Sequence, residues 1–153
     1  MVDSRAKGRT AEYKVRDLLR KRTGLENWER VPLSGAGHIK GDVYLSNSFN
    51  YYCIEVKSYK DDQIHSNLLN DTNSQLEKFW EQADREAKEM KAEPILVFKK
   101  DRGKWLIATE VAEMITPELI YQPTEEITLH IYLFESWLDT KDSSIFKKED
   151  YEI

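Results

Sequence analysis

Hydrophobic residues recur at three- and four-residue spacing over residues 4–22, and Gly24 follows this run as a helix stop. A second helix is expected from residue 74, because Ser74-Gln75-Leu76-Glu77 fits a capping box. Its apolar face continues at the same period until shortly before Pro94. The pattern therefore predicts two amphipathic helices that are far apart in the chain.

Between and after these helices, the pattern changes to short runs of β-branched and aromatic residues bounded by turn-forming residues. The expected strands cover residues 28–31, 42–46, 51–58, 95–100, 105–111 and 127–134. The fourth and fifth strands are expected to form a hairpin around Asp-Arg-Gly-Lys. The order α-β-β-β-α-β-β predicts one α/β domain over residues 1–153, with helices flanking a mixed central sheet.

Residues 112–153 follow this core as accessory elements and end in a charged tail, 139–153. The segment contains more large apolar side chains than the compact core requires. They are Ile115, Leu119, Ile120, Tyr121, Tyr132, Phe134 and Trp137. These residues either cover the core or form an interface between chains, and we expect the interface.

Composition excludes several classes of protein. The one cysteine, Cys53, excludes an intramolecular disulfide and a thiolate zinc cluster, and we expect it to fill space in a strand. No apolar run approaches the roughly 18 residues of a membrane span, and the polar first residues do not resemble a secretion signal. We expect a soluble, cytoplasmic protein without a membrane partner, from either a cellular or a viral (phage) source.

Charge is distributed unevenly along the chain. Residues 1–60 contain 12 Lys and Arg against 7 Asp and Glu, a net charge of +5. Residues 61–153 contain 11 against 21, a net charge of −10, and the whole chain has −5. The asymmetry favours a basic binding face on an acidic body, and the alternative is surface charge of no consequence.

Three charged residues interrupt strands that should fill a core: Asp42, Glu55 and Lys57. Because strand side chains alternate, Glu55 and Lys57 share one face about 6–7 Å apart, and an antiparallel neighbour would bring Asp42 beside Glu55. Carboxylates gathered at a sheet edge form an all-oxygen site suited to Mg²⁺, which takes one or two carboxylates and keeps several waters. Beside such a metal, Lys57 would stabilise charge on an attacked phosphate or help to position a water.

Each of these residues also has an ordinary structural interpretation. A Glu-x-Lys pair fits a solvated strand face with a cross-strand ion pair, and Asp42 suits a turn. Glu12 lies among Arg5, Arg9, Arg16 and Arg20 on one helical stripe, where it could simply pair with Arg9 or Arg16. The combination of these residues, rather than any single one, favours a chemical role.

That combination resembles the PD-(D/E)XK nuclease signature, in which an Asp precedes a hydrophobic strand that carries Glu-x-Lys; here G-D-V-Y-L is followed by I-E-V-K. It is similar in particular to archaeal-type Holliday-junction resolvases. Those proteins open with a helix bearing K-G-x-x-x-E, matched by residues 7–12, and have a Ser/Gly-rich loop, matched by residues 33–37. A Gln-opened helix and an apolar strand ending in Lys-Lys complete the similarity, which covers roughly residues 4–108.

The resemblance implies a restriction-endonuclease-like core and a metal-dependent endonuclease that acts as a homodimer on four-way DNA junctions. It implies Asp42 and Glu55 as ligands of Mg²⁺, with Mn²⁺ as a substitute, and Lys57 as the catalytic cation. It adds Glu12 as a further acid near the metal. Gly41 departs from the signature, which has proline before the Asp.

The resemblance also implies contacts to DNA. The expected set is Arg5, Lys7, Arg9, Arg16, Ser34, His38, Lys40 and Gln75. His38 and Lys40 belong to it because they lie in the Gly-rich loop before Asp42, and Gln75 is expected to support the site. The hairpin residues Lys99, Lys100, Arg102 and Lys104 either contact phosphates or form a solvated tip.

The sequence therefore predicts a Mg²⁺-dependent endonuclease that resolves four-way junctions by phosphodiester hydrolysis. One alternative is another PD-(D/E)XK nuclease of the repair or restriction type. An alternative of another class is a non-catalytic DNA-binding module. That module would have no need for a carboxylate pair, which repels phosphate.

Overall fold

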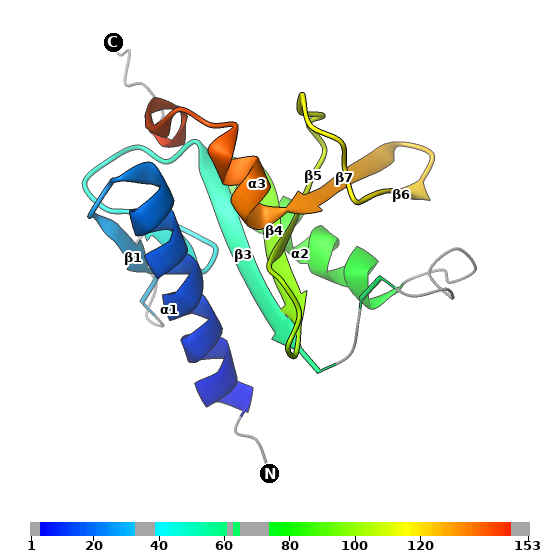
Figure 1. The fold of residues 1–153 in the computed structure, drawn as a ribbon, viewed down its shortest axis with the longest axis horizontal. Coiled ribbons are helices and arrows are strands. Elements are labelled where there is room, and N and C mark those ends of the chain that lie inside the picture. Colours follow the sequence, from blue (N-terminus) through cyan, green and yellow to red (C-terminus); the bar gives the residue numbers. More distant parts are fainter. Residues whose placement is uncertain (1–3, 33–38, 61–62, 65–73, 148–153) are drawn as a thin grey trace.

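The fold is built on one mixed sheet with helices on both faces (Figure 1). The structure is a computed structural model, and it describes residues 4–32, 39–60, 63–64 and 74–147 of the 153-residue chain. Its elements in chain order are α1 (Ser4–Thr23), β1 (Trp28–Arg30), β2 (Val43–Leu45), β3 (Tyr52–Tyr59), α2 (Gln75–Glu89), β4 (Glu93–Lys100), β5 (Leu106–Thr109), β6 (Leu119–Thr124), β7 (Ile127–Leu133), α3 (Phe134–Asp139) and a 3₁₀ turn (Ser143–Phe146). The first seven confirm the expected order, and the expected α/β class with a mixed sheet flanked by helices is confirmed.

The strands lie in the order β1-β2-β3-β4-β5-β7-β6. Only β3 and β4 run parallel among the described strand pairs, and α2 connects them; the other neighbours are antiparallel. The hairpin expected over 95–111 is the β4–β5 pair. At the other end, β2 pairs with β3 through Val43 and Ile54 and then leaves it, which opens a gap beside the second half of β3.

Alternation along the strands divides the core into two layers. Ile54 and Val56 of β3 pack with the apolar stripe of α1, while Leu96 and Phe98 of β4 pack with α2. The apolar face of α2 is buried as expected, and its N-terminus is capped by the Ser74 hydroxyl, which accepts from the Glu77 amide. Helices α1 and α3 therefore cover one face of the sheet and α2 the other (Figure 1).

The segment after residue 112 corrects the sequence analysis. The expected interface is wrong for Tyr121, Tyr132, Phe134 and Trp137, which are buried in the chain's own core, whereas Ile120 is 56% exposed. These side chains are buried because β6 and β7 extend the sheet and α3 folds back onto the α1 face. Neither β6 nor α3 was predicted.

The expected charged tail, 139–153, is wrong for the part that the structure describes. Its 3₁₀ turn buries Phe146, whose ring lies edge-on to Trp28 at 5.4 Å between centroids. Lys147 then forms an isolated bridge with Asn50. This segment adds Phe146 to the apolar layer under α1, where its ring also lies against Tyr52 and Trp137.

Cys53 is buried within β3, which confirms the expectation that it fills space in a strand, and Phe79 and Trp80 of α2 are buried in the core. His130 is half-buried beside Tyr132. His38 and His65 lie outside the described residues. No helix in the described part of the chain is long and apolar enough to span a membrane.

Candidate active site

Asp42 lies where β2 separates from β3, and its backbone is held on both sides. Its amide donates to the Ile54 carbonyl at 2.7 Å, and its own carbonyl accepts from the Val31 amide at 2.9 Å. Its carboxylate oxygen Oδ2 accepts from the Val56 amide at 2.8 Å. The side chain thus takes the place of the ladder partner that β3 loses there, which fixes one carboxylate at the gap in the sheet.

Gly41 explains the departure from the proline of the nuclease signature. Its φ is +85°, a conformation that proline cannot adopt. A Cβ atom there would also lie 2.8 Å from the Ile54 carbonyl oxygen. The chain therefore reaches Asp42 through a tight left-handed turn pressed against β3, and glycine is the residue that permits both features.

Glu55 lies on the α2 side of β3, as the alternation predicts, and is 1% exposed. Asp42 lies beside it in the same pocket, and Glu86 approaches it from α2. Burial raises the pKa of both Asp42 and Glu55, and for Glu55 the contact with Glu86 raises the pKa further. Two such carboxyl groups require a proton or a cation between them, because neighbouring buried charges of like sign repel.

Lys57 follows Glu55 on the same face of β3. Its Nζ donates to Gln82 Oε1 on α2 at 2.8 Å, and it lies 5.3 Å from the centre of the Phe79 ring. These two contacts hold a compact cation next to the carboxyl pair, and no carboxylate among the residues that the structure describes forms an ion pair with it.

Glu12 extends from α1 toward the pocket that contains Asp42, Glu55 and Lys57. Its Oε1 accepts from Arg30 Nε at 2.9 Å, and both side chains are mostly buried. Its charge helps to raise the pKa of Asp42, although burial of Asp42 is the larger cause. The pairing with Arg9 or Arg16 is therefore wrong: Arg30 holds Glu12, and Arg16 bonds Asp17 instead.

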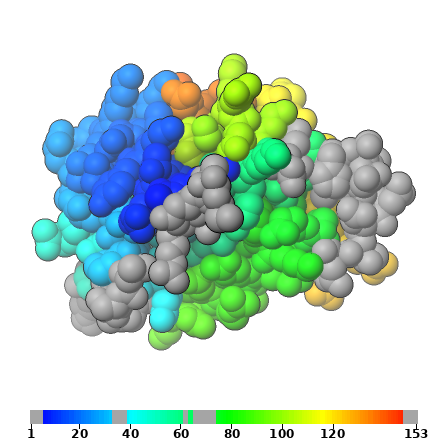
Figure 2. All heavy atoms as spheres, turned by 90° about the horizontal axis from the view of Figure 1, so that it is seen from below, coloured from blue at the N-terminus to red at the C-terminus, as the bar shows by residue number. Residues whose placement is uncertain are grey.

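One open pocket of about 480 Å³ brings together Glu12, Asp42, Glu55 and Lys57, with Gln82 on its α2 side. Figure 2 shows this end of the molecule, where the beginning of α1, the end of β3 and α2 meet on one face. Within the described residues, no group of three or more Asp, Glu, His or Cys side chains is arranged to hold a metal. Mg²⁺ is often bound by only one or two carboxylates and takes its remaining ligands from water or substrate.

The residues expected to contact DNA have different surroundings. Lys7 lines the pocket and pairs with Asp101 at 2.5 Å. Arg9 is exposed on α1, and Arg16 is half-buried in its pair with Asp17. For Arg5 only the backbone, within α1, is described.

Two further members of that set lie near the ends of α2. Lys40 Nζ is 3.8 Å from Glu89 Oε2 at the last turn, and Gln75 is exposed at the first. Ser34 and His38 are outside the described residues.

The sequence analysis missed Gln82, Glu86 and Arg30. Gln82 lies two turns after Gln75 on the same side of α2, so the polar stripe 75-82-86 beside the apolar face was a usable signal. Arg30 had no such signal, because its contact with Glu12 joins a strand to a helix.

An Asp before one strand, and a Glu and a Lys on one face of the next, at the edge of a mixed sheet flanked by helices, is the arrangement of a PD-(D/E)XK nuclease. Comparison with known families agrees. Residues 3–147 match the family described as "Phage putative PDDEXK endonuclease", and the chain belongs to that family. PD-(D/E)XK nucleases hydrolyse phosphodiester bonds and generally use a divalent metal.

Two individual proteins are similar to this chain. Protein D14 of Escherichia phage T5 is 50% identical in an alignment of 149 residues, with 90% of this chain and 92% of that protein covered. Archaeoglobus fulgidus Hjc, a Holliday junction resolvase, is 19% identical, with a TM-score of 0.42 over 92% of this chain and 87% of that one. The structural likeness is too weak to carry an argument about function.

Proposed function

We propose that this chain is a Mg²⁺-dependent DNA endonuclease that cuts four-way junctions as a homodimer. The observation that carries the nuclease part is the pocket that unites Asp42, Glu55 and Lys57. The three come from two strands whose separation leaves the Asp42 carboxylate in the gap beside β3. The junction part is supported by the sequence resemblance to archaeal-type resolvases, above all by the K-G-x-x-x-E pattern at residues 7–12.

Asp42 and Glu55 are the residues that would hold the metal. Their carboxyl groups are buried side by side, and burial raises the pKa of each, so a cation between them would relieve a repulsion that a proton otherwise relieves. When bound, a divalent cation lowers the pKa of a water and neutralises charge on a phosphate. Mn²⁺ prefers the same oxygen ligands and is the expected substitute.

The chain's own side chains contribute the rest of the site. Lys57 offers a positive charge to a phosphate oxygen, and Gln82 fixes the direction of its ammonium group. Glu12, restrained by Arg30, adds a carboxylate that can accept a hydrogen bond from a water on the α1 side of the pocket.

The electrostatics of the active-site pocket disfavour a non-catalytic DNA-binding module. The pocket contains Glu12, Asp42 and Glu55, with Glu55 nearly fully buried. Burying carboxylates costs free energy, and without a cation they also repel phosphate. A module that only bound DNA would gain nothing from retaining them.

Junction cleavage requires two cuts in opposed strands, and a four-way junction has near two-fold symmetry. A two-fold dimer would place one pocket on each strand. Helix α1 borders the pocket and carries Lys7, Arg9 and Arg16, which are proposed contacts to the DNA. The other proposed contacts are Arg5, Ser34, His38, Lys40 and Gln75.

The experiment is a cleavage assay with purified protein on labelled four-way junction, fork, duplex and single strand of matched sequence, each with Mg²⁺ and with EDTA. We expect symmetric cuts in opposed strands of the junction in Mg²⁺ only, with the duplex largely spared. Sedimentation at micromolar concentration should give about twice the chain mass of 18.0 kDa.

Two other results would each remove a different part of the proposal. A monomer that cuts duplex as readily as junction would remove the resolvase and leave the metal nuclease. Binding of DNA with no cleavage of any substrate in Mg²⁺ or Mn²⁺ would favour the binding module.

A further inference from the structure

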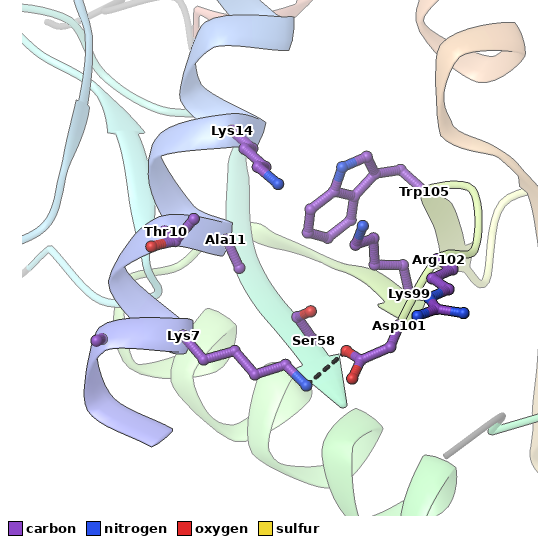
Figure 3. Close-up of a pocket in the computed structure, with 10 residues that line it drawn as sticks. Lys7, Thr10, Ala11, Lys14, Ser58, Lys99, Asp101, Arg102 and Trp105 are labelled. Carbon is purple, nitrogen blue, oxygen red and sulfur yellow. Dashed lines mark ion pairs between the residues drawn. The ribbon is translucent and has the colours of Figure 1, made fainter. Parts of the chain in front are cut away.

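A second cavity, of about 520 Å³, lies beside the active-site pocket, between α1 and the β4–β5 hairpin (Figure 3). Four cations line it: Lys7, Lys14, Lys99 and Arg102. Asp101 is the carboxylate among the lining residues, so the cavity is strongly positive in a chain whose net charge is −5. Such a local excess of positive charge attracts anions.

This basic cleft is continuous with the active-site pocket. Lys7, Ser58 and Asp101 line both. Ser58 follows the catalytic Lys57 along β3 and points to the α1 side of the sheet, whereas Lys57 points to the α2 side. A chain of phosphates that has one member at Lys57 can therefore place a neighbour in the cleft.

The hairpin divides its cations between the two faces of the sheet. Lys99 points into the basic cleft (Figure 3) and Arg102 lines it at the hairpin, whereas Lys100 and Lys104 line a different cavity. The two interpretations left open for the hairpin therefore apply to different residues. Of the four hairpin cations, Lys99 and Arg102 line the cavity beside the active-site pocket.

One cation of the cleft is held in place by an aromatic ring, and two others are available to bind an anion. Lys99 Nζ lies 5.5 Å from the centre of the Trp105 ring, which forms the apolar wall and holds the ammonium group. Lys14 and Arg102 form no ion pair with any residue that the structure describes. Available cations beside a catalytic pocket are what a phosphate backbone requires.

We propose that this basic cleft binds the backbone phosphates of the cut DNA strand that adjoin the scissile phosphate, through Lys14, Lys99 and Arg102. The inference rests on the proposed function for the identity of the polymer. It adds Lys14 to the DNA contacts expected from the sequence, and it assigns to Lys99 and Arg102 the phosphate contact that the sequence left open for the hairpin.

Asp101 limits this binding before DNA arrives. Its carboxylate pairs with Lys7 at the boundary between the two cavities (Figure 3), and it is 48% exposed. A phosphate entering the cleft must compete with Asp101 for Lys7. Removing the charge of Asp101 therefore releases a fourth cation for the DNA.

The test measures binding of a fluorescein-labelled four-way junction and a single strand by anisotropy, in EDTA, over a range of salt concentrations. Lys14→Gln and Arg102→Gln should each weaken binding about three- to tenfold, and the log–log salt slope should fall by about 0.7–0.9 for each phosphate that the variant no longer neutralises. Asp101→Asn should tighten binding. Thermal unfolding verifies that each variant is folded.

Two matched controls separate the cleft from general charge. Lys104→Gln removes an exposed cation of the same hairpin on its opposite side and should leave binding and slope unchanged. Glu81→Gln removes an exposed carboxylate of α2 and should tighten binding less than Asp101→Asn does. Equal losses of affinity in Arg102→Gln and Lys104→Gln would overturn the cleft, and so would wild-type binding by Lys14→Gln and Arg102→Gln.

The same proteins, assayed for junction cleavage in Mg²⁺, distinguish this inference from the proposed function. Wild-type cleavage with unaffected binding in the cleft variants would overturn the cleft alone. If the wild type binds DNA and the cleft variants bind it more weakly, but no protein cleaves any substrate, the nuclease alone is overturned. If the wild type binds neither the junction nor the single strand, both proposals are overturned.

Discussion

Two regions of this chain bury side chains of opposite character, apolar rings in one and carboxyl groups in the other. The segment from β6 to the 3₁₀ turn buries rings, with Tyr132, Trp137 and Phe146 packed into the layer under α1. The gap between β2 and β3 buries carboxyl groups, with Asp42 and Glu55 beside each other in one pocket. The first arrangement stabilises the fold, and the second costs stability, which the proposed cation would restore.

The contrast separates what each region contributes. Groups with strongly raised pKa values cluster at functional sites, so the proposed chemistry is assigned to the carboxyl pair and the scaffold to the ring cluster. Substitutions in the two regions should therefore have opposite signatures. Those in the pair should abolish activity and spare the fold, and those in the cluster should do the reverse.

The largest expected effect is on cleavage by Asp42→Asn and Lys57→Ala. Each should reduce cleavage at least about a thousandfold, because each removes a ligand or a charge used at the reacting phosphate. Junction binding, measured by anisotropy, should be retained, since phosphate affinity comes from Lys and Arg elsewhere. Either variant with cleavage within tenfold of wild type would contradict the assigned roles.

In the ring cluster, Trp137→Ala should destabilise the protein by about 3–5 kcal/mol, measured by urea unfolding. Trp137 is fully buried and packs against Tyr52, Phe134 and Phe146. Trp137→Phe should cost far less, because the indole Nε1 has no hydrogen-bond partner among the described residues. At low temperature the folded Trp137→Ala fraction should still cleave DNA, and its complete inactivity would break the separation of the two regions.

The pH dependence of stability sharpens the same contrast. Burial raises the pKa of Asp42 to about 6, and Glu12, Glu55 and Lys57 surround it. A raised carboxyl pKa stabilises the folded state at pH below about 4, and this contribution disappears as the pH rises through about 6. In EDTA, the free energy of unfolding of Asp42→Asn relative to wild type should therefore increase by about 2 kcal/mol from pH 4 to pH 7.

Mg²⁺ should reverse this trend in the wild type, because the ion takes the place of the proton as the pH rises. The measurement is urea unfolding at each pH, with and without Mg²⁺. If the free energies of unfolding of the wild type and of Asp42→Asn change in parallel with pH, burial does not raise the pKa of Asp42.

The smallest expected effect concerns the two glutamines of α2. Gln82→Ala should lower kcat about tenfold with little change in binding, because Lys57 loses the acceptor that directs it. Gln75→Ala, two turns earlier and exposed, is the matched control and should stay within about twofold of wild type. Equal effects of the two substitutions would show that Gln82 does not position Lys57.

Most of the fold could be predicted because its elements have local signals. The capping box at Ser74 is observed, and the alternation over 51–58 gives β3 the predicted faces. By contrast, β6 contains Pro123 and has a register shift, so its strand structure depends on pairing with β7 at the sheet edge. Pairing of that kind has no local signature.

The site could be predicted as far as strand geometry extends. Asp42, Glu55 and Lys57 follow from alternation and one antiparallel pair, and the structure brings them together as expected. Gln82, Glu86 and Arg30 did not follow, because their contacts depend on how helices pack on the sheet. The basic cleft likewise depends on α1 and the hairpin meeting in space.

The central claim is that Asp42 and Glu55 hold a metal that the chain uses to cut DNA. Its most direct test is cleavage of one labelled four-way junction by wild type and Glu55→Gln, purified in parallel, in Mg²⁺ and in EDTA. We predict paired cuts by the wild type in Mg²⁺ alone, and none by Glu55→Gln although it binds the junction. Full cleavage by Glu55→Gln, or undiminished cleavage by the wild type in EDTA, would contradict the claim.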